Sequence, residues 1–294
     1  MAKQVPTDRA AVAGGAVVDG LHEAAPDIAW QRLAVVNVAY VGAAGSGDGS
    51  WTLIDTGIPG SASEIAAAAE RRFGRKARPA AIIVTHGHFD HVGALEELAD
   101  RWRVPVFAHP LEVPYLDGSA SYPPADPTVG GGMMSALSRF YPRGPIDVSR
   151  WLHTLPADNT VPSLPGWQWL HTPGHTPGHV SLWRAADRTL IAGDAFITTA
   201  QESAYAVAMQ RPEVHGPPMY YTQDWNDARA SVQRLAALEP ATVITGHGRA
   251  LRGEAMRAAL RTLARNFDRI AVPQQGLYVD TPARADDGSA YRSP

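Results

Sequence analysis

The feature that most constrains this chain is a group of potential metal ligands directly behind an apolar run. The run Ala81-Ile82-Ile83-Val84 predicts a buried strand. His86, His88, Asp90 and His91 follow it and occupy a stretch of six positions. If the chain leaves the strand extended, His86 and His88 project to the same side, because they are two residues apart. Both imidazoles can then reach one ion at the edge of a sheet.

Asp90 and His91 are placed to reach a second ion beside the first. The segment from Val92 to Leu98 predicts a helix, and both residues would lie at its first turn. Gly87 lets the backbone turn between the two histidines because it has no Cβ. Imidazole and carboxylate are the ligands expected for Zn²⁺, and the same set is compatible with Fe²⁺ or Mn²⁺.

The composition narrows the choice of partners. The 294 residues are 45% hydrophobic and 19% charged, which is typical of a globular protein. The net charge of -3 gives no electrostatic case for nucleic acid or an anionic membrane surface. We therefore expect a small-molecule substrate, and the sequence is also compatible with a homo-oligomer. There is no cysteine, so any metal must be held by nitrogen and oxygen.

Two observations bear on the compartment. No apolar run approaches the length needed to span a bilayer. The stretch from Ala10 to Val18 is interrupted by glycines and follows both Lys3 and Asp8, which makes a poor signal peptide. The expectation is a cytoplasmic protein.

Strands and helices alternate along the first third of the chain. Ile28–Val41 predicts one or two strands, Trp51–Ile54 predicts another, and Glu64–Phe73 predicts a helix that Ser61 or Ser63 could cap. With the strand and helix around the histidines, this order indicates an α/β layered domain. We expect a single domain over residues 1–294.

The alternation stops from residue 112 to 150, where prolines and glycines predict an irregular insertion. Its aromatic and sulfur side chains favour a segment that covers the substrate, and an oligomer contact or a purely structural lid is the alternative. Later segments predict strands at 167–171, 179–183, 189–192 and 241–245, helices at about 224–238 and 253–270, a loop at 196–221 and a frayed tail from about 281.

Three of the later strands also end in a ligand-type side chain. His175 follows the strand that ends at His171, Asp194 follows Leu190-Ile191-Ala192, and His247 follows Val243-Ile244-Thr245. Strand ends converge at one edge of a sheet, which is where such folds build their sites.

The seven side chains divide into two sets joined by a carboxylate. His86, His88 and His175 would hold the first ion, whereas Asp90, His91 and His247 would hold the second. Asp194 could bridge both ions, since a carboxylate has two oxygens. Two ions about 3.5–4 Å apart are the arrangement of two-metal hydrolysis.

These motifs, in this order along the chain, resemble the metallo-β-lactamase superfamily. The resemblance rests on His86 to His91, Thr172 to His179, Gly193-Asp194 and Gly246-His247-Gly248, and also on Leu53 to Gly57. It implies an αββα sandwich, in which two mixed sheets lie face to face with helices outside. It also implies a binuclear metal site between the sheet edges, with the same seven ligands.

Details within the superfamily favour one branch. A bridging Asp194 is similar to glyoxalase II and to the lactonases, whereas true β-lactamases of the family usually have Cys or Ser there. Lactonases typically carry a Tyr three residues past the bridging Asp, and this chain has Ile197, although Tyr220 or Tyr221 could substitute. The last helix carries Arg257, Arg261 and Arg265, where glyoxalase II has basic residues for glutathione, but this spacing is more typical of a solvated helix face.

The resemblance implies a hydrolase in which a metal-bridging hydroxide attacks an ester, thioester, lactone or amide carbonyl. Asp90, besides ligating, could orient that hydroxide and pass a proton to the leaving group. The alternatives are an iron-dependent oxygenase on the same scaffold, β-lactam hydrolysis, which Asp194 disfavours, and a binding protein without turnover.

Other residues are candidates for supporting roles. Asp55, just past a strand, could accept from a ligating imidazole or could simply be a turn carboxylate, and His179 could support the site by hydrogen bonding. The candidate substrate pocket comprises Phe89, Met133, Met134, Phe140, Tyr141, Phe196, His215 and Tyr220.

Overall fold

The computed structural model describes residues 4–8, 11–13, 17–18 and 20–294. Part of the weakly apolar stretch from Ala10 to Val18 therefore lies outside the described residues, and so does Lys3. Within the described part of the chain, no helix is long and apolar enough to cross a membrane.

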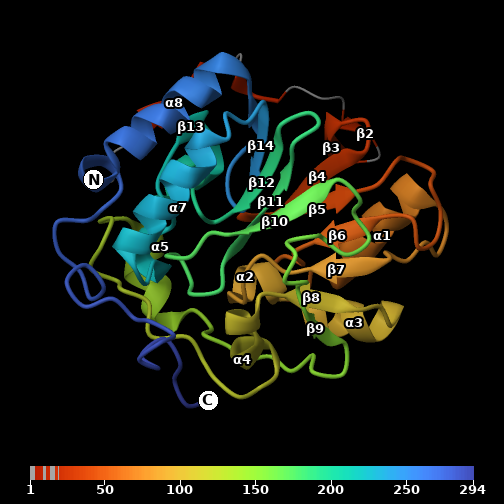
Figure 1. Ribbon diagram of the computed structural model, residues 1–294, viewed down its shortest axis with the longest axis horizontal. Coiled ribbons are helices and arrows are strands. Elements are labelled where there is room, and N and C mark those ends of the chain that lie inside the picture. Colours follow the sequence, from red (N-terminus) through yellow and green to blue (C-terminus); the bar gives the residue numbers. More distant parts are fainter. Residues whose placement is uncertain (1–3, 9–10, 14–16, 19) are drawn as a thin grey trace.

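The larger sheet is built from the N-terminal half of the chain and is mixed (Figure 1). Neighbouring strands are antiparallel from β2 to β6 and parallel from β6 to β9. In order across the sheet, the described strands are β2 (Val17–Val18), β3 (Leu21–Ala25), β4 (Ile28–Leu33), β5 (Val36–Val41), β6 (Thr52–Ile54), β7 (Ala81–Ile83), β8 (Val106–Ala108) and β9 (Leu152–Thr154).

The smaller sheet comes from the C-terminal half and is also mixed. Its central pair, β12 and β14, is parallel, and its other pairs are antiparallel. Its strands are β10 (Trp167–His171), β11 (Val180–Arg184), β12 (Thr189–Gly193), β14 (Thr242–Thr245) and β15 (Leu251–Arg252). A separate short pair joins β1 (Val5–Pro6) to β13 (Glu213–Val214).

Alternating side chains place β5 between two hydrophobic layers. Val36, Val38 and Tyr40 pack toward the helices outside the larger sheet, and Ala39 and Val41 pack toward the smaller sheet. Because both faces of the strand are buried, its sequence is a nearly continuous apolar run rather than an apolar–polar alternation. The inner layer also contains Leu182, Ile191 and Ile244 of the smaller sheet, so the two sheets share one core.

Helices cover the outer face of each sheet, which completes the expected αββα sandwich (Figure 1). The helices α1 (Ala62–Phe73) and α3 (Leu95–Trp102) pack on the larger sheet. The helices α7 (Trp225–Ala237), α8 (Gly253–Arg265) and α9 (Phe267–Ile270) pack on the smaller one. The remaining short helices are α2 (Phe89–Val92), η2 (Pro110–Glu112), α4 (Val113–Leu116), α5 (Met133–Leu137), η3 (Ser138–Phe140), α6 (Ala204–Met209) and η4 (Met219–Tyr221).

Three local predictions need correction. Ser61 precedes α1 but makes no side-chain cap hydrogen bond, because its backbone is already helical. The last long helix is interrupted at Asn266, whose φ of -120° and ψ of 27° leave the helical region. The segment 196–221 is not a plain loop, since it contains α6, β13 and η4.

The tail beyond residue 281 is packed rather than frayed. Ser121 and Arg292 exchange two backbone hydrogen bonds of 2.8 and 2.9 Å, and Ala290 is fully buried. The amide of Ala283 also donates to the carbonyl of Gln223 at 3.0 Å. The polar composition predicted fraying because it does not reveal that the insertion offers the tail a backbone edge to pair with.

Candidate metal centre

The larger sheet delivers four of the seven candidate ligands. β7 ends at Ile83, and His86 and His88 follow on the extended segment before α2. Asp90 and His91 lie in α2, a single turn. Gly93 and Ala94 separate it from α3, so the helix expected over Val92 to Leu98 is broken there. All four side chains are buried, so they face the interior of the sandwich rather than solvent.

The smaller sheet delivers the other three from its own strand ends. His175 follows β10, Asp194 directly follows β12, and His247 follows β14 by one residue. The amide of Val180 donates to the carbonyl of Thr85 at 3.0 Å, which ties the two sheets together beside the site. All three side chains are buried, with at most 2% of their surface exposed.

The seven side chains meet in three overlapping groups whose ligand atoms lie within 4.8 Å of one another. The first group is His86, His88 and His175, and the Nδ1 of His88 lies 3.0 Å from the Nε2 of His175. The second group is Asp90, His91 and His247, and the third joins His86 and His91 to Asp194.

Asp194 lies between the first two groups. Its Oδ2 is 3.5 Å from the Nε2 of His175, and it is 3.5 and 3.1 Å from the Nε2 atoms of His91 and His247. Its Oδ1 is buried and has no hydrogen-bond partner. The carboxylate is thus positioned to contact occupants of both groups.

Most of the histidines use one ring nitrogen for a partner outside the cluster. The Nδ1 of His91 is 2.8 Å from Asp55, that of His247 is 2.7 Å from the carbonyl of Val35, and that of His175 is 3.3 Å from Thr222. Such contacts fix the ring orientation and the tautomer of a metal-binding imidazole.

Asp55 contacts both His91 and the turn that carries His86 and His88, which we call the first histidine turn. Its carboxylate accepts from the amide and the hydroxyl of Thr85, at 2.8 and 2.7 Å, and the hydroxyl lies 3.1 Å from the Nδ1 of His86. Asp55 has a φ of 59°, a left-handed backbone conformation that is unusual outside glycine. It is therefore more than a turn carboxylate.

The donor set fits a metal ion. The Nε2 atoms of His86, His88 and His91 are buried without any hydrogen-bond partner, like the Oδ1 of Asp194. Buried polar atoms rarely stay unpaired, and four of them together in one cluster are suited to coordinating a cation.

For His86, His88 and Asp194 the electrostatics favour the protonation states that metal binding requires, whereas the carboxylates of Asp194 and Asp55 raise the pKa of His91. Burial and the neighbouring imidazoles lower the pKa of His86 and of His88 well below the usual value. Burial would raise the pKa of Asp194, but His247 and His91 outweigh it and hold that pKa well below the usual value. Neutral imidazole and ionised carboxylate are the forms that bind divalent metals.

His179 supports the site without facing it. Its Nε2 accepts from the amide of Asp194 at 2.8 Å, and its Nδ1 lies 2.8 Å from the hydroxyl of Thr172. Both ring nitrogens are therefore occupied by protein partners, which leaves none for an ion.

Four of the expected pocket residues lie together beside the cluster, namely Phe89, Met134, Tyr141 and Tyr220. The ring of Phe89 is 5.6 Å from that of Tyr141, which lies 6.1 and 6.4 Å from Tyr220 and Tyr221. Met134 joins this wall through the hydroxyl of Tyr141, 3.7 Å from its sulfur.

The other expected pocket residues lie elsewhere. Met133 and Phe140 point to solvent, with 59% and 70% of their surfaces exposed, because α5 and η3 turn these side chains outward. His215 faces Glu213 and Gln4, at 3.6 and 3.4 Å, on the side of the smaller sheet.

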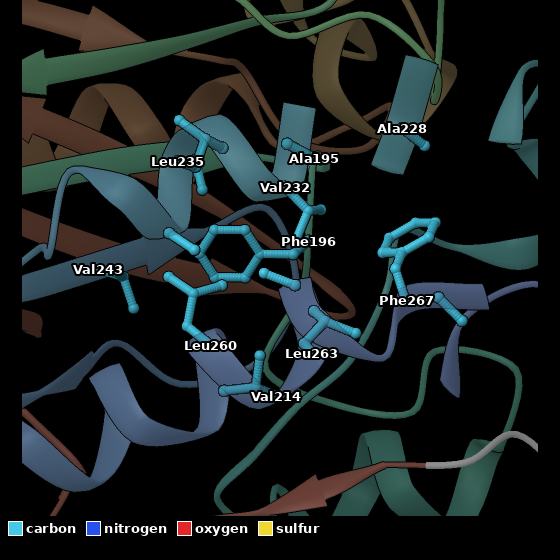
Figure 2. Packing of buried hydrophobic residues seen from close by; sticks show 14 of the residues in the cluster. Ala195, Phe196, Val214, Ala228, Val232, Leu235, Val243, Leu260, Leu263 and Phe267 are labelled. Atoms are coloured by element: carbon cyan, nitrogen blue, oxygen red, sulfur yellow. The ribbon is translucent and has the colours of Figure 1, made fainter. Parts of the chain in front are cut away.

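Phe196 is a core residue rather than a pocket residue. It is fully buried, and Figure 2 shows its ring among Val232, Leu235 and Leu260, beneath α7 and α8. The sequence assigned it to the candidate substrate pocket, but its ring lies in the hydrophobic core.

Sequence reasoning missed two residues beside the cluster. Glu112 and Tyr122, from the insertion, reach the first histidine turn. Tyr221, which the sequence offered together with Tyr220, stacks on His88 with ring centroids 4.3 Å apart. Burial raises the pKa of Glu112, against four hydrogen bonds that favour its carboxylate. The only available signal was a lone acidic residue at the start of an aromatic segment, which is too common to indicate a role.

Comparison with known proteins agrees with this geometry. The chain is 45% identical over 248 residues to a Bacillus subtilis protein named probable metallo-hydrolase YflN, covering 84% of this chain and 94% of that protein. It is 34% identical over 171 residues to a hydroxyacylglutathione hydrolase of Alkalilimnicola ehrlichii, covering 58% of this chain and 48% of that one.

A solved structure shares the fold. A beta-lactamase domain protein from Burkholderia ambifaria matches with a TM-score of 0.58 and 21% identity, over 91% of this chain and 80% of that one. The sequence pattern of the family described as Metallo-beta-lactamase superfamily matches residues 32–247. This range contains all seven clustered side chains, and the chain belongs to the metallo-β-lactamase superfamily.

Proposed function

We propose that this protein is a hydrolase that uses two divalent metal ions, most readily Zn²⁺, to cleave the acyl–oxygen or acyl–sulfur bond of an ester, thioester or lactone. The observation that carries the proposal is the set of three overlapping ligand groups with four unpaired buried atoms. The relative named probable metallo-hydrolase, at 45% identity, supports the same class of reaction.

Each residue has a distinct part in this proposal. His86, His88 and His175 would hold one ion, Asp90, His91 and His247 the other, and Asp194 would contact both. Two such ions, when bound, supply a Lewis acid for the carbonyl oxygen and lower the pKa of a water.

Asp90 is proposed as the catalytic carboxylate. It is the most exposed of the seven side chains, at 7%, and its Oδ2 lies 3.4 Å from the Nε2 of His247. From there it would orient the attacking water and pass a proton to the leaving group.

The neutral aromatic wall supports an uncharged acyl group as the substrate. Phe89, Tyr141, Tyr220 and Tyr221 carry no charge, and such walls bind apolar parts of small molecules. A glyoxalase II-like substrate is less well supported. In α8, Arg257 forms an ion pair of 2.7 Å with Glu254, and Arg261 forms one of 2.6 Å with Glu239. These arginines are already neutralised, so they do not form a free site for an anionic thiol.

The test combines metal analysis with turnover. The purified protein is expected to contain about two zinc equivalents and to hydrolyse members of a panel of esters, thioesters and lactones. His88→Ala and Asp194→Ala should each lower both bound metal and turnover by a factor of 10 or more, on the order seen when site partners are removed. Full activity without metal would overturn the proposal, as would an iron-loaded protein that consumes oxygen and hydrolyses nothing.

A further inference from the structure

Glu112 is a fully buried carboxylate that lies between the two histidine-bearing turns. It is the last residue of η2, at the start of the insertion, and it has no measurable exposed surface. It does not belong to any of the three ligand groups. Its side chain points instead at the backbone that carries those ligands.

Each oxygen of Glu112 serves one turn. Oε2 accepts from the amide of Gly87 at 2.9 Å and from the hydroxyl of Tyr122. Oε1 accepts from the amide of Gly178 and the hydroxyl of Thr176, both at 2.8 Å. An ionised carboxylate offers about four acceptor sites, which matches these four donors.

The turns are shaped to receive this side chain. A Cβ at position 178 would lie 2.7 Å from the Cγ of Glu112, and one at position 87 would lie 2.9 Å from the hydroxyl of Tyr122. Gly87 does not have a positive φ, so close approach, rather than the turn itself, explains the glycine there.

The contacts flank one ligand group in particular. Gly87 lies between His86 and His88, and Thr176 directly follows His175. These three histidines form the first ligand group, and they come from different sheets. The backbone hydrogen bond from Val180 to Thr85 joins the two sheets close to these turns. The Glu112 carboxylate adds a direct side-chain link between the turns themselves.

We propose that Glu112 is a positioning residue for the first metal ion: it fixes the separation of the two turns so that His86, His88 and His175 converge. The inference rests on the proposed metal site. It also makes the insertion part of that site, since the link comes from the insertion and not from either sheet.

Glu112→Gln tests the link with little change in shape. A glutamine keeps one acceptor oxygen and replaces the other with an NH₂ group. The hydroxyls of Tyr122 and Thr176 can rotate to accept from that group, but a backbone N–H cannot. If the NH₂ group replaces Oε1, the amide of Gly178 loses its acceptor. If it replaces Oε2, the amide of Gly87 keeps only the hydroxyl of Tyr122, at 2.8 Å. In both orientations the side chain loses its hydrogen bond to one of the two backbone amides.

The measurement is zinc affinity by competition with a chromophoric chelator, together with the absorption spectrum of the Co²⁺-loaded protein. We expect Glu112→Gln to bind one equivalent about 10- to 100-fold more weakly, the range found for residues that orient metal ligands. The second equivalent should bind as in the wild type, and the Co²⁺ spectrum should change. Thr176→Val, which removes one donor, should weaken the same equivalent less.

Glu213→Gln is the matched control, because Glu213 is also a buried glutamate that accepts from a backbone amide, that of Ala200 at 2.9 Å. It should leave both zinc affinities unchanged. If Glu112→Gln and Thr176→Val bind both equivalents with wild-type affinity and spectrum, Glu112 has a merely structural role and the inference is wrong. A wild-type protein that binds no zinc would instead overturn the proposed function itself.

Discussion

Among individual side chains, the hydroxyl of Tyr221 gives the clearest indication of a role in substrate binding. It is buried without a hydrogen-bond partner, while its ring stacks on His88. An unpaired buried hydroxyl costs about 1–3 kcal/mol, so a protein that keeps one beside its site gains something other than stability. A substrate oxygen would provide the missing partner.

Tyr221→Phe is therefore expected to raise the free energy of unfolding slightly, by up to about 1 kcal/mol, while lowering kcat/KM about 10-fold. Urea denaturation and steady-state kinetics measure the two effects on the same preparation. Zinc content should not change. Tyr205→Phe, on an exposed tyrosine of α6, is the control. Unchanged kinetics would assign the hydroxyl no part in substrate binding.

Individual site residues could be predicted where a metal-ligating side chain comes shortly after a predicted strand. Each of the seven clustered side chains follows a strand by a few positions, so spacing alone suggested that they meet. Glu112 and Thr222 could not be found in this way, because their contacts depend on the path of irregular segments. Periodicity carries no information about such paths.

At the scale of elements, packing separates two phenylalanines that the sequence placed in one pocket. Phe196 fills the core beneath α7 and α8 (Figure 2). Phe140 lies exposed beside Arg139. The sequence shows that both are aromatic and lie in irregular segments, but not which way each one faces.

Phe196→Ala is expected to lower the free energy of unfolding by about 3–5 kcal/mol, the usual cost of emptying a core position. Phe140→Ala should change it by less than about 0.5 kcal/mol, because the side chain is exposed. Chemical denaturation of the two variants gives the comparison. Zinc stoichiometry of folded Phe196→Ala should match the wild type. A stable Phe196→Ala variant with altered substrate preference would restore the pocket assignment.

The regular elements were predictable because their periodicity is strong. Trp167–His171 matches β10 residue for residue, and the helix expected from Asp224 begins there, with the Asp224 carboxylate accepting from Asn226 at 2.9 Å. The break at Asn266 and the short elements within 196–221 were not predictable. The apolar spacing continues through Asn266, and the short elements within 196–221 contain too few residues to show a period.

For the whole molecule, Glu213 makes stability depend on pH. Burial raises its pKa to about 7, partly opposed by the amide of Ala200 and by Arg211. The folded protein thus binds this proton more tightly than the unfolded chain does. The stabilisation is fully present below about pH 4.5 and is lost as the pH rises through about 7.

Glu213→Gln is expected to remove this loss, which is on the order of 1–3 kcal/mol between pH 5 and 8. Urea denaturation of the metal-free wild type and variant at both values measures it, since the difference between them cancels the contribution of the histidines. Equal pH dependence in both proteins would show that Glu213 does not titrate in this range.

The candidate ligands come from both sheets, and this affects the order in which the protein folds. His86 and His247 are about 160 residues apart in the chain, and neither sheet alone supplies a complete set. Contacts this distant in sequence form late, after the entropy of closing the chain has been overcome. The ions would then be captured by a nearly native chain, and they would prolong the lifetime of the native state without speeding its formation.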